Sequence, residues 1–323
     1  MKRKFSFPFQ TFAIWFVLIG LGIFFSIMSP AFLRPDNLFN IGKQVAVLGI
    51  LSVGMACVIL TGGIDLTVGS LLAVTGTIGA MLMVNVGLHP IPSAIIAAMA
   101  SVVVGFISGV TIVYFHVPPL ITTLAFMTVF RGVAYLLTKG QPVYGLPEGF
   151  VVLGQGYLWL VPIPTVFMLT IFAIGSFFLN RTKMGLYIYA LGCNEEATRL
   201  AGINIKRLRI LVYVISGSLA GISGVLLLAR LNSGQPTVGW DTALDVITAV
   251  VLGGVSIFGG EGKLSGVLAG AFIMGVLSNG LIILGVGEYF QMVVKGMVLV
   301  IAVAIDQQSK IRKSKIIKHT MES

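Results

Sequence analysis

Long apolar runs separated by short polar connections constrain this chain more than any other feature. Ten runs approach the length of about 20 residues that a helix needs to cross a lipid bilayer. They lie at about 11–28, 45–61, 68–87, 92–115, 119–138, 161–180, 209–229, 242–258, 264–285 and 289–306. Hydrophobic residues make up 57% of the sequence and charged residues only 10%, against about 25% charged in ordinary soluble domains. The pattern predicts an all-α polytopic membrane protein in which residues 1–323 form a single transmembrane domain.

Lysine and arginine residues are distributed unequally between the connections. Three lie in segment 1–10, five in 181–208 and five in 307–323, and Arg209 and Lys263 bring this group to fifteen of 21. Because basic residues concentrate on the cytoplasmic side of membrane proteins, we expect both termini and the loop 181–208 to be cytoplasmic. The net charge of +10 is therefore interpreted as a topology signal. Nucleic acid is not an expected partner, since the basic residues form no single patch with aromatic residues among them.

The loop 181–208 contains a short helix with recognisable ends. Asn194 is a favourable N-cap, Glu195 and Glu196 fall in the first turn, where the helix dipole favours negative charge, and Gly202 is placed for a left-handed stop. A helix of this length is not stable alone in water. It is therefore expected to pack against another surface.

The apolar side of this short helix suggests what that surface is. Ala197, Leu200 and Ala201 fall on one side, and Glu195 and Arg199 are four residues apart and can pair. One interpretation is a loop helix that lies on its own chain. The other is a cytoplasmic helix that inserts its apolar side into a partner subunit.

Two Gly-Gly pairs interrupt apolar runs at corresponding places and indicate a weak internal duplication. Gly62 and Gly63 interrupt one run, and Gly253 and Gly254 interrupt another. Matching glycine breaks in duplicated helix bundles are typical of transporters. Asp65 follows the first break and is interpreted either as a cap for the next span or as a residue with a role in transport.

Charged residues within or beside the runs are candidates for function, because charge inside a membrane is costly. They are Asp65, Arg131, Asp241, Asp245, Glu288 and Lys295. We expect Asp241 and Glu288 at helix ends, Lys295 facing protein or water, and Arg131 extending outward along its long stem. Neutral hydrogen-bonding residues that suit an uncharged polyol are Asn232, Ser233, Gln235, Thr237, Ser278, Asn279 and Gln291. The candidate translocation or gating residues are Asp65, Gly62, Gly63, Gly253, Gly254, Asn279 and Gln291.

No pattern predicts an enzyme, a metal site or a cofactor. The three histidines, His89, His116 and His319, are scattered without metal-ligand spacing. The segment 257–265 resembles a phosphate-binding loop but has Ile257 and Leu264 where that motif requires glycine and a hydroxyl residue. Any energy from ATP must therefore enter through another subunit.

The segment from Lys139 to Leu160 is long for a connection in a compact bundle and is rich in glycine, proline and aromatic residues. It should carry most of the outer face. We consider two roles for it: a passive, partly helical cap, or a segment that binds or closes.

Motifs spread over nearly the whole chain point to one family. They read LTGGIDLTVGS at 60–70, NEEATRLAGI at 194–203, AVVLGG at 249–254, SNGL at 278–281 and YFQMVVKG at 289–296. Through them the sequence resembles the permease subunits of bacterial ABC importers for ribose and related monosaccharides. The resemblance implies about ten spans in the bacterial plasma membrane. It also implies a second permease copy or sister permease, a separate ABC ATPase and an extracytoplasmic sugar-binding protein. Residues 194–203 would be the coupling helix that docks in the ATPase.

The sequence indicates the transported sugar less specifically than it indicates the family. Relative to the ribose pattern the chain departs at Cys193, Ala243, Val255, Ser278 and Ile282, and four of these five changes shorten or remove a polar group. Ribose is the first expectation, and xylose, galactose-type sugars, the autoinducer-2 class and nucleosides stay open. The alternative function is an ion-coupled secondary transporter or facilitator of a small neutral solute, which would work as one chain.

Overall fold

The computed structural model describes the backbone of residues 9–322 and the side chains of residues 14–308. Most of the predicted N-terminal segment 1–10, and the side chains of most of the tail 307–323, lie outside this range. The helices are α1 (Phe9–Met28), α2 (Pro35–Leu60), α3 (Val68–Val84), α4 (Pro90–Tyr114), α5 (Pro119–Thr138), α6 (Glu148–Gln155), α7 (Ile163–Arg181), α8 (Lys183–Cys193), α9 (Glu195–Leu200), α10 (Ile205–Leu231), α11 (Thr242–Leu252), α12 (Leu264–Ile283) and α13 (Glu288–Glu322). Four strands of two residues each are β1 (Val143–Tyr144), β2 (Tyr157–Leu158), β3 (Val161–Pro162) and β4 (Ser233–Gly234). Within the described residues the chain is predominantly helical, as predicted.

Several helices begin at residues that suit a helix start. Pro35, Pro90 and Pro119 are the first residues of α2, α4 and α5, where the missing N–H costs no hydrogen bond. The α5 and α10 helices end at Lys139 and Asn232, which adopt left-handed backbone with φ of 52°. These local signals set the helix ends, and packing sets the arrangement.

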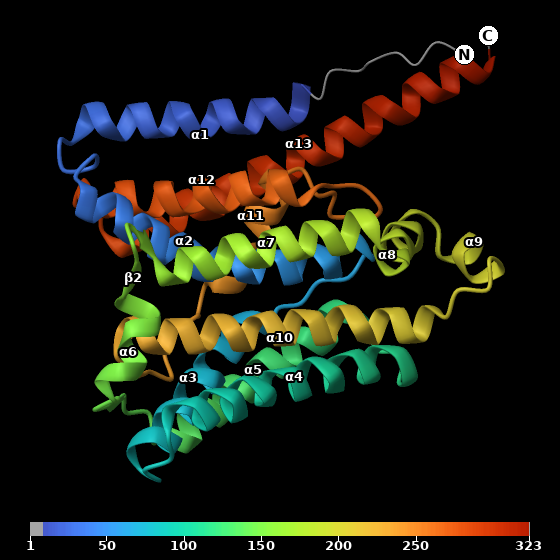
Figure 1. The fold of residues 1–323 in the computed structure, drawn as a ribbon. Helices are drawn as coiled ribbons and strands as arrows, with labels where there is room; N and C mark the ends of the chain where they lie inside the picture. Colours follow the sequence, from blue (N-terminus) through green and yellow to red (C-terminus); the bar gives the residue numbers. More distant parts are fainter. Residues whose placement is uncertain (1–8, 323) are drawn as a thin grey trace.

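The helices stack side by side in a bundle with α10 at its centre (Figure 1). On one side α10 packs against α3 and α4, and α5 packs against α3. On the other side α10 packs against α2, which also contacts α7, α11 and α12. The α1 and α13 helices form the outermost layer, against α12 and α11 respectively. Most of α2 is buried, so it is the core helix of the bundle.

Among the residues that the structure describes, seven helices are long and apolar enough to cross a membrane: α2, α4, α5, α7, α10, α12 and the first part of α13, Glu288–Gln308. The apolar helices Ile14–Met28, Val68–Val84 and Thr242–Leu252 are shorter. Each of these ten helices overlaps one of the predicted runs, but the three short ones do not meet the length for a complete crossing. The count of ten spans stays a prediction.

Glycine residues let two of the helices approach closely. A Cβ atom on Gly105 of α4 would lie 2.4 Å from the carbonyl oxygen of Tyr213, and one on Gly217 of α10 would lie 2.4 Å from that of Ser101. Both distances are too short for a real side chain. The backbones of α4 and α10 are therefore in direct contact.

The two Gly-Gly breaks produce non-helical segments within the bundle. The α2 helix ends at Leu60 and the chain runs through 61–67 to α3, while α11 ends at Leu252 and the chain loops through 253–263 to α12. The two segments meet, because the Gly260 amide donates a hydrogen bond of 3.0 Å to the Leu60 carbonyl. Non-helical backbone buried within a protein needs such internal partners. Whether the two breaks reflect a duplication stays a prediction.

The segment from Lys139 to Leu160 is partly helical and lies at the end of the bundle opposite α9 (Figure 1). The β1 strand pairs with β4, the short α6 helix follows, and β2 pairs with β3. The Lys43 ammonium of α2 donates to the Gln155 carbonyl over 2.8 Å and lies 4.3 Å from the centre of the Tyr157 ring. These contacts tie the segment to the bundle. They fit the expected cap and leave a closing role as a prediction.

Arg131 does not extend outward, as we had expected, but turns into the protein. Its side chain is buried, and its guanidinium donates to the carbonyls of Pro236 and Val238 over 2.8 and 2.5 Å. The guanidinium also lies 5.6 Å from the centre of the Trp240 ring. The loop between β4 and α11 leaves these carbonyls without strand partners, so a charged donor from α5 satisfies them.

Candidate functional site

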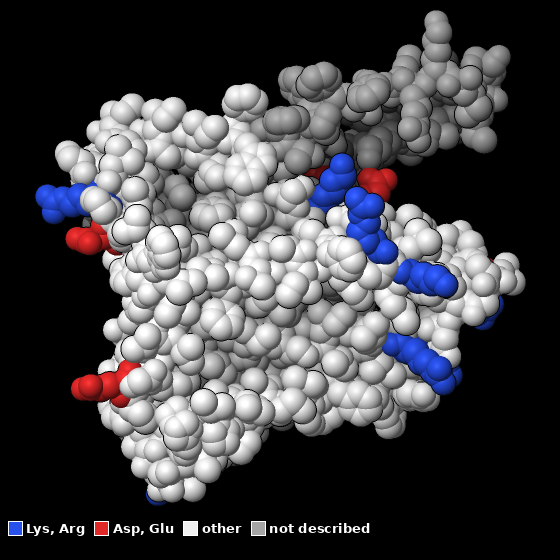
Figure 2. Space-filling view, viewed as in Figure 1, with Lys and Arg blue, Asp and Glu red and all other residues white. Residues whose placement is uncertain are grey.

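Charge is concentrated at the end of the molecule that carries α8 and α9. On the face shown in Figure 2, most lysine and arginine side chains gather there, and a broad uncharged band separates them from the charges at the opposite end. Large apolar side chains are exposed within the long helices, among them Phe106 of α4, Val129 of α5 and Ile174 of α7. Exposed apolar surface of this extent suits contact with lipid.

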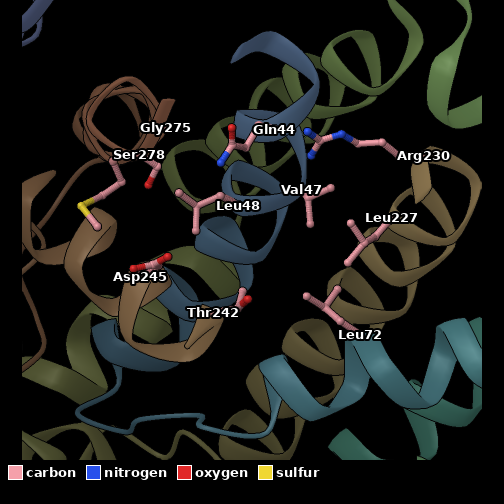
Figure 3. A pocket seen from close by; sticks show the side chains of 11 residues that line it. Gln44, Val47, Leu48, Leu72, Leu227, Arg230, Thr242, Asp245, Gly275 and Ser278 are labelled. Atoms are coloured by element: carbon pink, nitrogen blue, oxygen red, sulfur yellow. The ribbon is translucent and has the colours of Figure 1, made fainter. Parts of the chain in front are cut away.

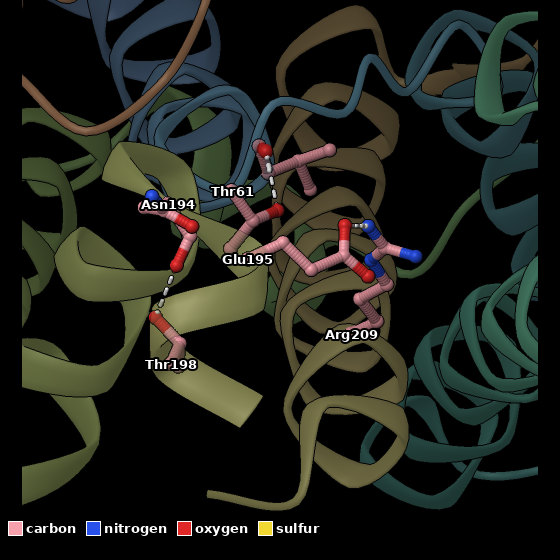
Figure 4. A network of polar contacts seen from close by, with 6 residues as sticks. Thr61, Asn194, Glu195, Thr198 and Arg209 are labelled. Atoms are coloured by element: carbon pink, nitrogen blue, oxygen red, sulfur yellow. Dashed lines mark hydrogen bonds and ion pairs between the residues drawn. The ribbon is translucent and has the colours of Figure 1, made fainter. Parts of the chain in front are cut away.

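The α9 helix forms the tip of the charged end (Figures 1 and 4). Asn194 caps it as predicted, because its side-chain oxygen accepts from the Ala197 amide over 2.9 Å, and Gly202 has the predicted left-handed backbone with φ of 79°. The Thr198 side chain is buried and donates to the Asn194 carbonyl over 2.7 Å. The local sequence therefore fixes both ends of the helix.

The predicted pairing of Glu195 with Arg199 is wrong. Arg199 pairs with Glu196 at 2.6 Å, while Glu195 pairs with Arg209 of α10 at 2.5 Å. Figure 4 shows the second pair reaching from α9 to α10. The Glu195 carboxylate thus connects α9 to the long helix that follows it, which four-residue spacing alone does not reveal.

The apolar side of α9 is not covered by the described part of the chain. Ala197, Leu200 and Ala201 are all exposed, and 79% of the Leu200 surface is accessible. A helix of six residues with an exposed leucine does not gain stability from burial on its own protein. This geometry favours the interpretation in which α9 seats its apolar side in a partner.

A second candidate site is a cavity of about 150 Å³ inside the bundle (Figure 3). It lies between α2, α3, α10, α11 and α12, and its lining residues are Gln44, Val47, Leu48, Leu72, Leu227, Arg230, Thr242, Asp245, Met274, Gly275 and Ser278. Figure 3 shows the polar side chains around a central open space, with Gln44 and Arg230 on one side and Asp245 and Thr242 across from them. The cavity lies in the half of the bundle away from α9, since residues from the first part of α2 and the last part of α10 line it.

Asp245 carries the negative charge of this cavity and is paired with a lysine. The Lys295 ammonium of α13 lies 2.7 Å from a carboxylate oxygen of Asp245, and the two side chains are 23% and 19% exposed. Lys295 therefore faces protein, as predicted. Asp245 therefore lines the cavity as one half of an ion pair that links α11 to α13.

The chemistry of the lining suits a small hydrated solute. Amide, hydroxyl, carboxylate and guanidinium groups on several sides can donate and accept hydrogen bonds, while Val47, Leu48 and Leu227 offer apolar surface. The volume is below the roughly 300–1,000 Å³ of pockets for drug-sized ligands.

A larger hollow of about 520 Å³ between α4 and α6 is lined by apolar side chains apart from His89, and it offers few groups that could bind a small hydrated solute. Among the residues with described side chains, no group of three or more metal-binding residues occurs.

Asp65, the first of the predicted path residues, does not line the cavity but joins two elements. Its side chain is fully buried; one oxygen accepts from the amide and hydroxyl of Thr67, and the other accepts from the Ser216 hydroxyl over 2.6 Å. The contact with Thr67 stabilises the turn before α3, while the contact with Ser216 links that turn to α10. This arrangement favours a structural role over direct contact with a solute.

The other predicted path residues are dispersed. Gly62 and Gly63 lie in the first break and Gly253 and Gly254 in the second; Gly62 has φ of 78° and Gly254 has φ of 82°. Asn279 exchanges hydrogen bonds of 3.0 and 2.9 Å with Asn37, and Gln291 donates to the Val286 carbonyl over 2.7 Å. None of them is a lining residue of the cavity.

Sequence reasoning did not select Gln44, Arg230 and Thr242 as path residues. It noted Asp245 and Ser278 only within larger groups of polar residues. In the sequence these residues stand out only as single polar residues within or beside apolar runs. That they lie at the same level of the bundle becomes visible only when the helices are placed side by side.

Comparison with known proteins identifies the family. Residues 37–303 match the family described as "Branched-chain amino acid transport system / permease component". The chain belongs to this family of permease components. No solved structure matches the chain significantly.

Related permeases align with this one over most of its length. It is 42% identical to the ribose import permease protein RbsC of Bacillus subtilis over 293 residues, which cover 90% of this chain and 91% of the relative. It is 44% identical to RbsC of Escherichia coli, with 88% and 90% of the two chains covered. The xylose transport system permease protein XylH of Escherichia coli is 33% identical, with 94% and 93% covered.

The predicted family is thereby confirmed. The matched family and these relatives are permease components of transport systems, so this permease is an integral membrane transport subunit and not itself an enzyme.

Proposed function

We propose that this permease is the transmembrane subunit of an ATP-driven importer for a monosaccharide, ribose or a closely related sugar. The observation that carries the proposal is its similarity along almost the whole chain to relatives named as ribose import permeases. The family description names branched-chain amino acids, but the xylose permease, also similar along its whole length, favours a sugar.

The proposed partners follow from α9 and from the family. An ABC ATPase would receive the exposed Leu200 side of α9, and an extracytoplasmic sugar-binding protein would deliver the solute at the opposite end. A second permease copy or a sister permease would complete the membrane part. The gathering of basic residues at the α9 end supports a cytoplasmic position for it, with both termini on that side of a bacterial plasma membrane and lipid around the apolar band.

Reconstitution in liposomes tests this proposal. The permease alone should accumulate no sugar, because the ATPase proposed to drive uptake is a separate subunit. With its ATPase and binding protein it should accumulate radiolabelled ribose, xylose or another monosaccharide when ATP is supplied. Uptake by the permease alone under a proton or sodium gradient would instead identify a secondary transporter, and uptake of leucine but no sugar would overturn the substrate class.

We further propose that the cavity between α2 and α11 forms part of the sugar's path. Its hydroxyl groups on Thr242 and Ser278 would bind sugar hydroxyls. Thr242→Val and Ser278→Ala should each raise the KM for uptake about fivefold, the effect of one lost hydrogen bond, with little change in maximal rate. Thr170→Val is the matched control, because the Thr170 hydroxyl bonds only to the Val166 carbonyl of its own helix. An unchanged KM in both cavity variants would remove the cavity from the path.

A further inference from the structure

Three segments far apart in the sequence meet beside α9. The end of α2, the loop 253–263 and the last turn of α8 come together where the Gly260 amide donates to the Leu60 carbonyl over 3.0 Å. This hydrogen bond joins the two glycine breaks to each other. No local sequence pattern requires it, because the two residues lie far apart along the chain.

Gly192, near the end of α8, lies directly against this hydrogen bond. A Cβ atom at Gly192 would be 1.9 Å from the Leu60 oxygen and 2.4 Å from the Gly260 nitrogen. Contacts this short do not occur between real side chains and backbone, and backbone atoms cannot move aside as a flexible side chain can. Only glycine therefore allows α8 to touch both breaks at once.

The loop 253–263 is held by further bonds on both of its sides. From α8, the Tyr189 hydroxyl donates to the Gly262 carbonyl over 3.0 Å; burial raises the pKa of this phenol, so it stays protonated. From α13, the Asp306 carboxylate accepts from the Ser256 hydroxyl and the Ile257 amide over 3.3 and 3.4 Å. The loop is therefore clamped between α8 and α13.

Each element at this junction leads from α9 toward the cavity. Asn194 follows α8 directly and is the N-cap of α9, so the two helices meet at a corner with no flexible linker. The α2 helix carries Gln44 and Leu48 near its middle, and α11, which precedes the loop, carries Thr242 and Asp245. A displacement of α9 would reach both cavity-lining helices through this junction.

We propose that Gly192 and Tyr189 are positioning residues that transmit movement of α9 to the ends of α2 and α11, and so couple ATP hydrolysis to opening of the path. This inference rests on the proposed function. It predicts that the junction governs the ratio of sugar moved to ATP hydrolysed by the importer that folds.

The test uses the complete importer in liposomes, with permease, ATPase and binding protein. Gly192→Ala should retain the ATPase in the purified complex but lower the sugar moved per ATP about tenfold, within the usual range of coupling between sites. Gly105→Ala is the matched control: its Cβ would also meet a backbone oxygen, at 2.4 Å, but between α4 and α10. It should lower the yield of complex and leave the ratio unchanged.

Tyr189→Phe keeps the test decisive if Gly192→Ala does not fold, because it removes one hydroxyl and adds no atom. Tyr189→Phe should lower the sugar moved per ATP hydrolysed about fivefold, the effect of one lost hydrogen bond. If Tyr189→Phe and any folded Gly192→Ala keep the ratio of the unmodified importer, the inference is wrong. If the unmodified importer itself shows no ATP-dependent sugar uptake, it is the proposed function that fails.

Discussion

Leu200→Glu is expected to abolish ATPase binding and ATP-driven uptake while leaving the permease in the membrane at its normal level. Leu200 is 79% exposed on the apolar side of α9, so the substitution costs the free permease little. In the complex it would place a carboxylate against an apolar partner surface without a counter-ion. That should weaken binding by about 4 kcal/mol, roughly a thousandfold in affinity.

Co-purification of a tagged ATPase with the permease measures this effect. Leu200→Met is the matched control, because methionine keeps the apolar contact and should bind normally. Smaller losses, about fivefold, are expected for Glu196→Lys and Arg199→Glu, which disturb an exposed ion pair and the charge at the ends of α9. Full co-purification and uptake with Leu200→Glu would show that α9 is not the docking helix.

Lys295→Met is expected to destabilise the permease by about 3 kcal/mol. Lys295 lies 2.7 Å from Asp245, and both side chains are less than a quarter exposed. Removing the ammonium would leave the carboxylate partly buried without a compensating charge, which costs far more than the pair itself contributes. The midpoint of thermal unfolding of the detergent-solubilised permease should fall by several degrees.

A double-mutant cycle distinguishes loss of a pair from simple damage to α13. Lys295→Met combined with Asp245→Asn should be more stable than Lys295→Met alone, because no unpaired charge remains. The exposed pair of Arg199 and Glu196 supplies the control, and Arg199→Met should cost less than about 1 kcal/mol. Equal unfolding midpoints for Lys295→Met and the unmodified permease would rule out the ion pair as a support of the α11–α13 contact.

Features that depend on neighbouring residues were predictable from the sequence. Asn194 and Gly202 end α9 as predicted, because capping is decided by the hydrogen bonds and backbone conformation of a few adjacent residues. The breaks at Gly62 and Gly253 stand where the apolar runs are interrupted.

Features that depend on distant residues were not predictable. Arg131 turned inward because the loop at Pro236 and Val238 presents unpaired carbonyls to it, more than a hundred residues away along the chain. Glu195 paired with Arg209 and not with Arg199 because α10 returns beside α9. In each case the sequence allowed several partners, and spatial proximity selected one.

The sequence by itself determined that this protein is a bundle of membrane helices with one capped, amphipathic helix at its basic end, because apolar run length and capping act over a few turns. Only the tertiary structure decided that Gln44, Arg230, Thr242, Asp245 and Ser278 face one cavity, and that Gly192, Leu60 and Gly260 meet at one point. Depth in the bundle and the side that each helix presents are set by packing against other helices. The spacing of residues along one chain does not contain that information.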